Sequence, residues 1–155
     1  MENIESPTKL AHSFILIYQT DKDRCITLPI RVEDFAKKQG LDTVYKPLNA
    51  SVAGILVRAH QNDPLTVVIN ANDSMSMQRF TLAHILGRAL MQQINENPAP
   101  VAQVIMREDT NLKSKNEINR WANTFACRLL VPKHPLCTLW AHRMKRQELA
   151  VDILH

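Results

Sequence analysis

The sequence predicts an α+β fold in which helices at both ends of the chain enclose a central group of strands. Apolar residues recur at helical spacing near the start, in the middle and towards the end of the chain. Three short runs with strand character lie between the first and second of these regions. The chain has 155 residues, 45% of them hydrophobic, which suffices to bury an ordinary core without a metal or a disulfide. No internal repeat or linker divides it, so we expect one domain over residues 1–155.

The first part of the chain is expected to form two helices. Ser6 is a suitable N-cap and Pro7 favours the first helical position, so a helix is predicted over residues 6–20. A shorter helix is predicted from Val32 to Gln39. Gly40 should end it, because a residue without a Cβ adopts the left-handed conformation that follows many helices.

Strands and a longer helix are expected in the middle of the chain. The strand-like runs cover residues 43–45, 52–57 and 65–69, with a turn at 62–64 before the last. A helix then follows over about residues 76–93. The conformation of residues 94–113 is not determined by the pattern. Residues 95–100 break the helix, and 101–106 fit a strand or a loop.

The last part of the chain is expected to be helical over residues 115–130, about 135–142 and 145–154. The segment S-K-N-E at 114–117 has the pattern of a capping box. Ser114 would be the N-cap, and the carboxylate of Glu117 would accept a hydrogen bond from its backbone amide. This structural role is favoured for Glu117 over a role as a metal ligand.

The middle helix carries the most informative motif, R-F-T-L-A-H-I-L-G-R at residues 79–88. Its residue pattern resembles the H-E-x-x-H helix of zinc peptidases, in which two His one turn apart bind the metal and the Glu activates water. Only the first His is present, as His84. Ile85 stands at the Glu position and accepts no proton, and Arg88 stands at the second His position as a permanent cation.

Several segments of the chain, in order, resemble the ImmA/IrrE-type metallopeptidases, small zincin-like proteins of bacteria, plasmids and phages. The resemblance covers about residues 28–132, with the helices at 6–20 and within 133–155 as extensions. It implies a small zincin-like α+β domain, with a short three-stranded antiparallel sheet packed against the motif helix. The segments that carry it are 28–41, 50–56, the V-V-I-N at 67–70, the motif at 79–87 and A-N-T-F-A-C-R-L-L-V-P at 122–132.

The departures from the family pattern predict a degenerate site. Family members place a third metal ligand, a Glu, three residues before the A-N of the closing helix, and here that residue is Asn119. An amide oxygen brings no charge, so two of the three ligand positions are unsuited to Zn²⁺. We therefore predict no catalytic residue, bound metal or cofactor, and a vestigial site at His84, Ile85, Arg88, Asn119 and Asn123. A site rebuilt from His84, Cys127 or another His is the alternative.

Arg88 is the residue that most needs explanation. His84 and Arg88 lie one turn apart on the face expected to meet Asn119 and Asn123, so the guanidinium can replace the metal as an internal cation. It would donate to the amide oxygens, with the neutral ring of His84 as a further acceptor. A buried cation needs a carboxylate such as Glu117 or access to solvent. Equally, Arg88 can extend to water from the end of its helix.

Composition bounds the location and the other roles. Three cysteines, Cys25, Cys127 and Cys137, show no C-x-x-C spacing, which favours a reduced compartment over a disulfide framework. Neither a signal peptide nor a membrane-spanning run is present, so we expect a cytoplasmic protein. The net charge of +4 and the basic last quarter permit direct binding of nucleic acid. A solvated helix face is favoured, because no helix-turn-helix or zinc-finger pattern accompanies the charge. Trp121 and Trp140 are expected to anchor the core or an interface.

Three classes of function follow. The resemblance implies a regulatory or toxin–antitoxin role, because family members act on, or are encoded beside, helix-turn-helix repressors of the Xre type. With its catalytic positions changed, this chain would bind such a repressor or antitoxin without cleaving it. The first alternative is an active hydrolase or peptidase with a rebuilt site, and the second is a basic nucleic-acid-binding protein.

Overall fold

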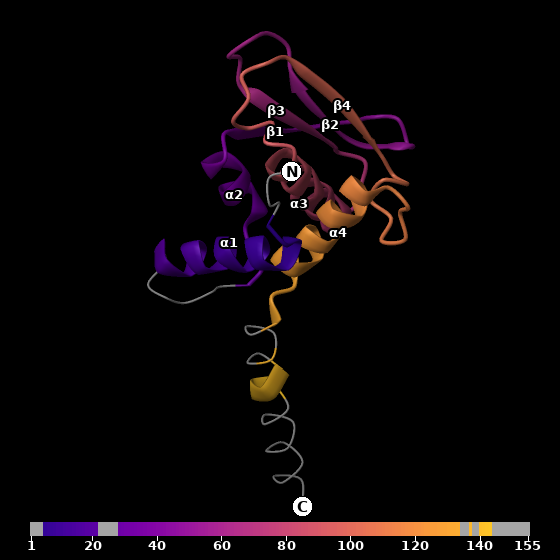
Figure 1. Ribbon diagram of the computed structural model, residues 1–155. Coiled ribbons are helices and arrows are strands. Elements are labelled where there is room, and N and C mark those ends of the chain that lie inside the picture. The colour runs from indigo at the N-terminus through magenta and orange to yellow at the C-terminus, as the bar shows by residue number, and fades with distance from the viewer. Residues whose placement is uncertain (1–4, 22–27, 134–136, 138–139, 144–155) are drawn as a thin grey trace, which may run out of the picture.

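The computed structural model describes residues 5–21, 28–133, 137 and 140–143, and within them the helices lie on one side of the sheet (Figure 1). The helices are α1 (Pro7–Asp21), α2 (Val32–Lys38), α3 (Met75–Met91) and α4 (Glu117–Leu130). The strands are β1 (Leu41–Lys46), β2 (Val52–Arg58), β3 (Leu65–Asn70) and β4 (Val101–Met106). The α+β class expected from the sequence is confirmed.

The sheet differs from the expected three antiparallel strands. It has four strands in the order β1-β3-β2-β4, and β1 pairs with β3 in parallel. Strand β3 lies between β1 and β2 and pairs antiparallel with β2. The fourth strand, β4, pairs antiparallel with β2. The sequence left residues 101–106 open between a strand and a loop, and the structure shows a strand with polar Gln103 between Val101 and Ile105 on its helix-facing side.

The expected helices are present with small shifts at their ends. As predicted, α1 begins at Pro7 and α2 stops before Gly40, whose φ of +75° favours glycine. The motif helix α3 begins at Met75, one residue earlier than predicted. Its N-cap is Ser74, whose Oγ accepts a hydrogen bond from the amide of Met77.

The predicted capping box at Ser114 and Glu117 is wrong. The N-cap of α4 is Asn116, whose side chain accepts a hydrogen bond from the amide of Asn119 at 3.1 Å. Asn caps helices as well as Ser does, and Asn116 directly precedes the first helical residue. Glu117 is therefore the exposed first residue of α4. The helices predicted over 135–142 and 145–154 lie largely outside the described residues.

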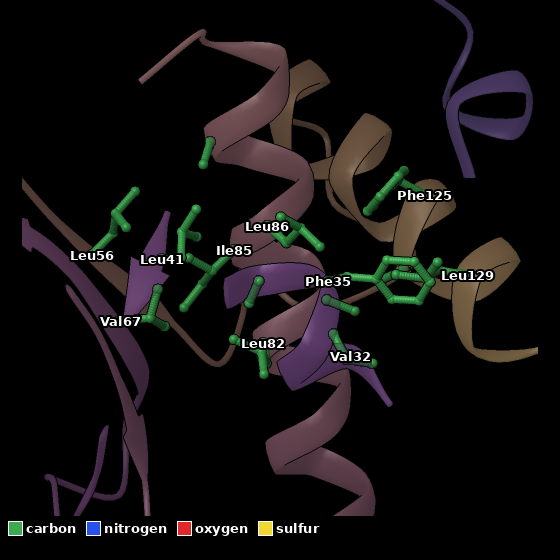
Figure 2. Packing of buried hydrophobic residues seen from close by; sticks show 14 of the residues in the cluster. Val32, Phe35, Leu41, Leu56, Val67, Leu82, Ile85, Leu86, Phe125 and Leu129 are labelled. Atoms are coloured by element: carbon green, nitrogen blue, oxygen red, sulfur yellow. The ribbon is translucent and has the colours of Figure 1, made fainter. Parts of the chain in front are cut away.

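Helix α3 lies between the sheet and α4, and a glycine permits close approach on each side. A Cβ on Gly54 of β2 would lie 2.9 Å from Cδ1 of Ile85, and one on Gly87 of α3 would lie 2.9 Å from the ring of Phe125. Figure 2 shows Ile85 on the side of α3 that faces Leu41 and Val67. The residue at the Glu position of the motif is therefore a core residue.

Aromatic rings join the N-terminal helix to the rest of the core. The ring of Phe14 packs edge-on against Phe125 of α4, with centroids 5.9 Å apart, and lies 5.6 Å from that of Phe35. Trp121 stacks on Phe125, which confirms its expected place at the core. Trp140, by contrast, is 68% exposed and is not a core residue.

Candidate functional site

The site predicted from the motif comes together between α3 and α4. His84 and Arg88 project from α3 towards Asn123 and Asn119 of α4, and each pair is joined by a direct hydrogen bond. His84 Nδ1 lies 2.8 Å from Asn123 Oδ1, and Arg88 donates through one terminal nitrogen to Asn119 Oδ1 at 2.7 Å. The two pairs lie in register because each helix spaces its residues four apart, which is about one turn.

The partners of Asn123 fix the protonation of His84. The Nδ2 amide group of Asn123 donates to the carbonyl oxygens of Asp109 and Asn111, at 3.1 and 2.9 Å. Its Oδ1 is therefore the acceptor that faces His84, so the imidazole carries its hydrogen on Nδ1. The other nitrogen, Nε2, keeps a lone pair. It is buried and has no hydrogen-bond partner in the structure.

The imidazole of His84 is held neutral. Its pKa is lowered to about 4, chiefly by burial. The hydrogen bond with Asn123 is the next largest effect and raises the pKa, the charge of Arg88 lowers it, and the charge of Asp109 raises it. The side chain is fully buried. At neutral pH the ring is therefore uncharged, and it can coexist with a guanidinium one turn away.

Arg88 is held by three elements of the fold. Besides its bond to Asn119 of α4, its second terminal nitrogen donates to Gln103 Oε1 of β4 at 3.2 Å. Asn119 in turn donates through Nδ2 to Asp109 Oδ1 at 2.6 Å. Burial lowers the pKa of Arg88, and the charge of Asp109 opposes that shift. The guanidinium is thus charge-compensated through one intervening amide, while its Nε is buried without a partner.

This arrangement matches the bridging role considered for Arg88, with two differences in detail. Arg88 donates to Asn119 but to neither Asn123 nor His84, and its second acceptor is Gln103. The carboxylate that supports it is Asp109 of the β4–α4 connection, whereas Glu117 is exposed. Sequence reasoning missed Gln103 and Asp109, because both lie in the segment 94–113 whose conformation the pattern left open.

The donor set does not fit the zinc ion that the resemblance implies. His84 Nε2 is a competent donor, but the second position holds a cation, and the side-chain oxygen at the third already accepts a hydrogen bond from that cation. In the described residues, no group of three His, Cys, Asp or Glu side chains is placed to bind a metal. No catalytic step is therefore derived through zinc.

Cys127 does not supply the expected alternative centre. It lies on α4, partly exposed, and burial raises the pKa of its thiol despite the nearby charge of Arg128. A thiol with a raised pKa is protonated at neutral pH and is a weak nucleophile. Among the described residues, the site thus combines a neutral imidazole with a hydrogen-bonded guanidinium. The nearby carboxylate of Asp109 already accepts hydrogen bonds from Asn119 and from the amide of Met106.

Comparison with protein-family models matches residues 36–153 to Peptidase_M78, described as the IrrE N-terminal-like domain. The match covers well over half of the 155 residues and includes both α3 and α4. No curated protein matches the chain. In the part of the chain that the structure describes, no helix is both long and apolar enough to cross a membrane.

Proposed function

The chain belongs to the Peptidase_M78 family, and we propose that it acts there by binding a protein partner without cleaving it. The partner is a helix-turn-helix repressor of the Xre type, or an antitoxin, in a regulatory or toxin–antitoxin module. One observation carries the proposal. The guanidinium of Arg88, at the second ligand position, donates a hydrogen bond to Asn119, at the third. These two positions now stabilise each other and leave no place for a metal.

The loss of the base supports the same conclusion. Hydrolysis at this site would need a group that accepts a proton from water beside His84. The adjacent residue, Ile85, is fully buried and packs towards Gly54 of the sheet. A carboxylate at that position would be buried among apolar groups. The helix face that would present a base therefore contributes packing to the core.

The sheet offers a place for an extended partner segment. Among the strands that the structure describes, β4 pairs only with β2, so its other side is an edge of the sheet. An edge strand presents backbone donors and acceptors that an added strand can pair with. Gln103 of β4 accepts a hydrogen bond from Arg88, so a segment added beside β4 would lie next to the altered site. We place the partner there.

Binding and cleavage are tested together. The purified chain is mixed with the Xre-type repressor encoded nearest to its gene, and complex formation is measured by isothermal titration calorimetry. The same mixture is incubated with Zn²⁺ and analysed by mass spectrometry. We expect a complex and an intact repressor. A cleaved repressor would establish the hydrolase alternative, and retention on DNA alone, lost with rising salt, would establish the nucleic-acid alternative.

A metal test probes the site without a partner. Zn²⁺ should leave the melting temperature of the native chain unchanged, because His84 is the one competent donor among the three ligand positions. In the restored variant Ile85→Glu/Arg88→His/Asn119→Glu, the buried carboxylates should lower stability, and Zn²⁺ should return about 2 to 4 kcal/mol at saturating concentration. Ile85→Glu alone is the matched control, and it should gain nothing from the metal. Stoichiometric zinc in the native chain would contradict the proposal.

A further inference from the structure

Among the described residues, no helix covers the face of the sheet that points away from α3, and the β1–β2 connection covers only its end at Asn70. Gly54 of β2 faces α3, because a Cβ there would meet Ile85 and Thr81. The next residue, Ile55, therefore points to the opposite face, since successive side chains in a strand alternate. Figure 1 shows the helices gathered on the other side of the sheet.

An apolar row crosses this open face. In the sheet register, Ile55 lies opposite Val68 of β3 and Val104 of β4, and Val68 lies opposite Val44 of β1. Residues in register point to the same face, so one apolar side chain from each strand forms the row. At its two ends Val44 is 37% exposed and Val104 is 54% exposed. A continuous apolar row of this kind is typical of a surface that packs against another layer.

The charges on β1 lie symmetrically about the row. Asp42 and Lys46 are two residues before and two residues after Val44, and both are exposed on the same face. They are about 13 Å apart along the strand, too far to pair with each other. A two-fold rotation about an axis along the row would exchange their positions, bringing each opposite a residue of the other sign.

We infer that this face binds a second copy of the chain, forming a symmetric dimer with the two-fold axis along the row of Val44, Val68, Ile55 and Val104. The two sheets would pack face to face, about 10 Å apart. Asp42 would face Lys46 of the second copy, and Lys46 would face its Asp42. The same rotation places Val57 over Val52 of the second copy, which matches apolar with apolar.

Charge balance favours a second copy over a highly charged partner. The chain carries a net charge of +4, whereas the charged groups of this face, Asp42 and Lys46, cancel. Nucleic acid or an acidic protein would gain no net attraction from such a surface. An isologous interface needs a self-complementary patch, and this pattern supplies one.

The oligomeric state tests the inference directly. Sedimentation equilibrium of the full chain should show a monomer–dimer equilibrium. Val104→Lys places a charge in the row on an exposed edge strand, where folding tolerates it, and should give a monomer. The matched control is Leu112→Lys, because Leu112 is also exposed, at 62%, but lies in the β4–α4 connection away from this face. This control should leave the dimer intact.

A charge exchange tests the geometry. Asp42→Lys places like charges opposite each other twice in the dimer and should raise the dissociation constant about tenfold or more. Adding Lys46→Asp restores opposite charges across the axis and should recover most of the affinity. A native chain that stays monomeric at its highest soluble concentration overturns the inference. So does a double variant as weak as Asp42→Lys alone, because the proposed axis would then be wrong. Neither result depends on the repressor proposed above.

Discussion

Two arginines in this molecule, Arg58, which is buried, and Arg88, which is partly buried, are held in opposite ways. Arg58, at the end of β2, is 7% exposed, and its donors reach backbone carbonyls. Its Nε donates to Asp63, and one terminal nitrogen donates to the carbonyls of Ile94, Asn97 and Ala99. Arg88 instead donates to the side chains of Asn119 and Gln103. One arginine is bound by the backbone and the other by side chains.

The difference separates a cation held by the backbone from one held by particular side chains. Backbone carbonyls are present whatever the side chains, so Arg58 joins the β2–β3 and α3–β4 connections through acceptors that substitution does not remove. The acceptors of Arg88 exist only because Asn119 and Gln103 are the residues present. Two buried nitrogens around Arg88, its own Nε and His84 Nε2, have no hydrogen-bond partner in the structure, whereas no buried nitrogen of Arg58 is left without one.

The largest effect is expected at Arg58. Arg58→Met keeps the apolar stem but leaves carbonyls of two connections without their donor, so the free energy of unfolding should fall by about 3 to 4 kcal/mol. Urea denaturation measures it. Arg58→Lys keeps the charge with fewer directed donors and should lose less than Arg58→Met. A loss for Arg58→Met smaller than that of Arg88→Met would reverse the comparison.

His84 should make stability depend on pH. Its pKa is lowered to about 4 in the folded chain, from an ordinary value of 6.5, so the unfolded chain binds the proton first as pH falls. The stability that comes from keeping His84 neutral is fully present above pH 6.5 and is lost as the pH falls from 6.5 to 4. A shift of this size corresponds to about 3 kcal/mol. Urea denaturation across this range measures it.

His84→Gln is the control for that dependence, because it removes the titrating group and keeps a polar side chain near Asn123. The variant should be less stable than the native chain at pH 7, and its stability should fall less steeply between pH 6.5 and 4. Parallel curves for the two proteins would show that the folded chain admits the charged imidazole. The ring would then not be sealed beside Arg88.

Arg88→Ala should destabilise the fold by about 1 to 3 kcal/mol, because Asn119 and Gln103 each lose a donor. Arg88→Met separates the packing of the stem from the hydrogen bonds. A double-mutant cycle with Asn119→Ala measures the coupling directly, and we expect it to exceed about 0.5 kcal/mol. Independent effects of the two substitutions would mean that Arg88 is a solvated replacement that has acquired no role.

The elements of the fold were largely predictable, whereas their pairing was not. Pro7 and Gly40 act locally through fixed backbone preferences, so the ends of α1 and α2 that they set could be read from the sequence. The parallel pairing requires β1 to join the β3 edge of the β2–β3 hairpin, and no local sequence pattern encodes which edge it joins. Ser114 and Asn116 are both suitable N-caps for α4, and the sequence alone did not show that the helix begins directly after Asn116.

The same division holds for the site. The resemblance to the family motifs identified His84, Arg88, Asn119 and Asn123, and the spacing of regular helices placed each pair on one face. Asp109 supports Arg88 from an irregular connection, where spacing along the chain gives no direction in space. The carboxylate that offsets the partly buried Arg88 therefore had to be found in the structure. The helices fixed where the cation lies, and the connection supplied its charge balance.

The smallest effect on stability is expected at Gln103, which joins the altered site to the edge of the sheet. Its Oε1 accepts from Arg88 and its Nε2 donates to Gln92, on a strand edge that water reaches. Water can replace the lost acceptor in Gln103→Ala, so the free energy of unfolding should fall by less than about 1 kcal/mol. If the partner pairs with β4, calorimetry should show repressor binding weakened several-fold more than this loss explains. Gln92→Ala is the matched control, because the side chain of Gln92 is hydrogen-bonded to Gln103 and not to Arg88, and this variant should bind almost normally. Equal binding by both variants would move the partner away from β4 and leave Arg88, like Arg58, a structural cation.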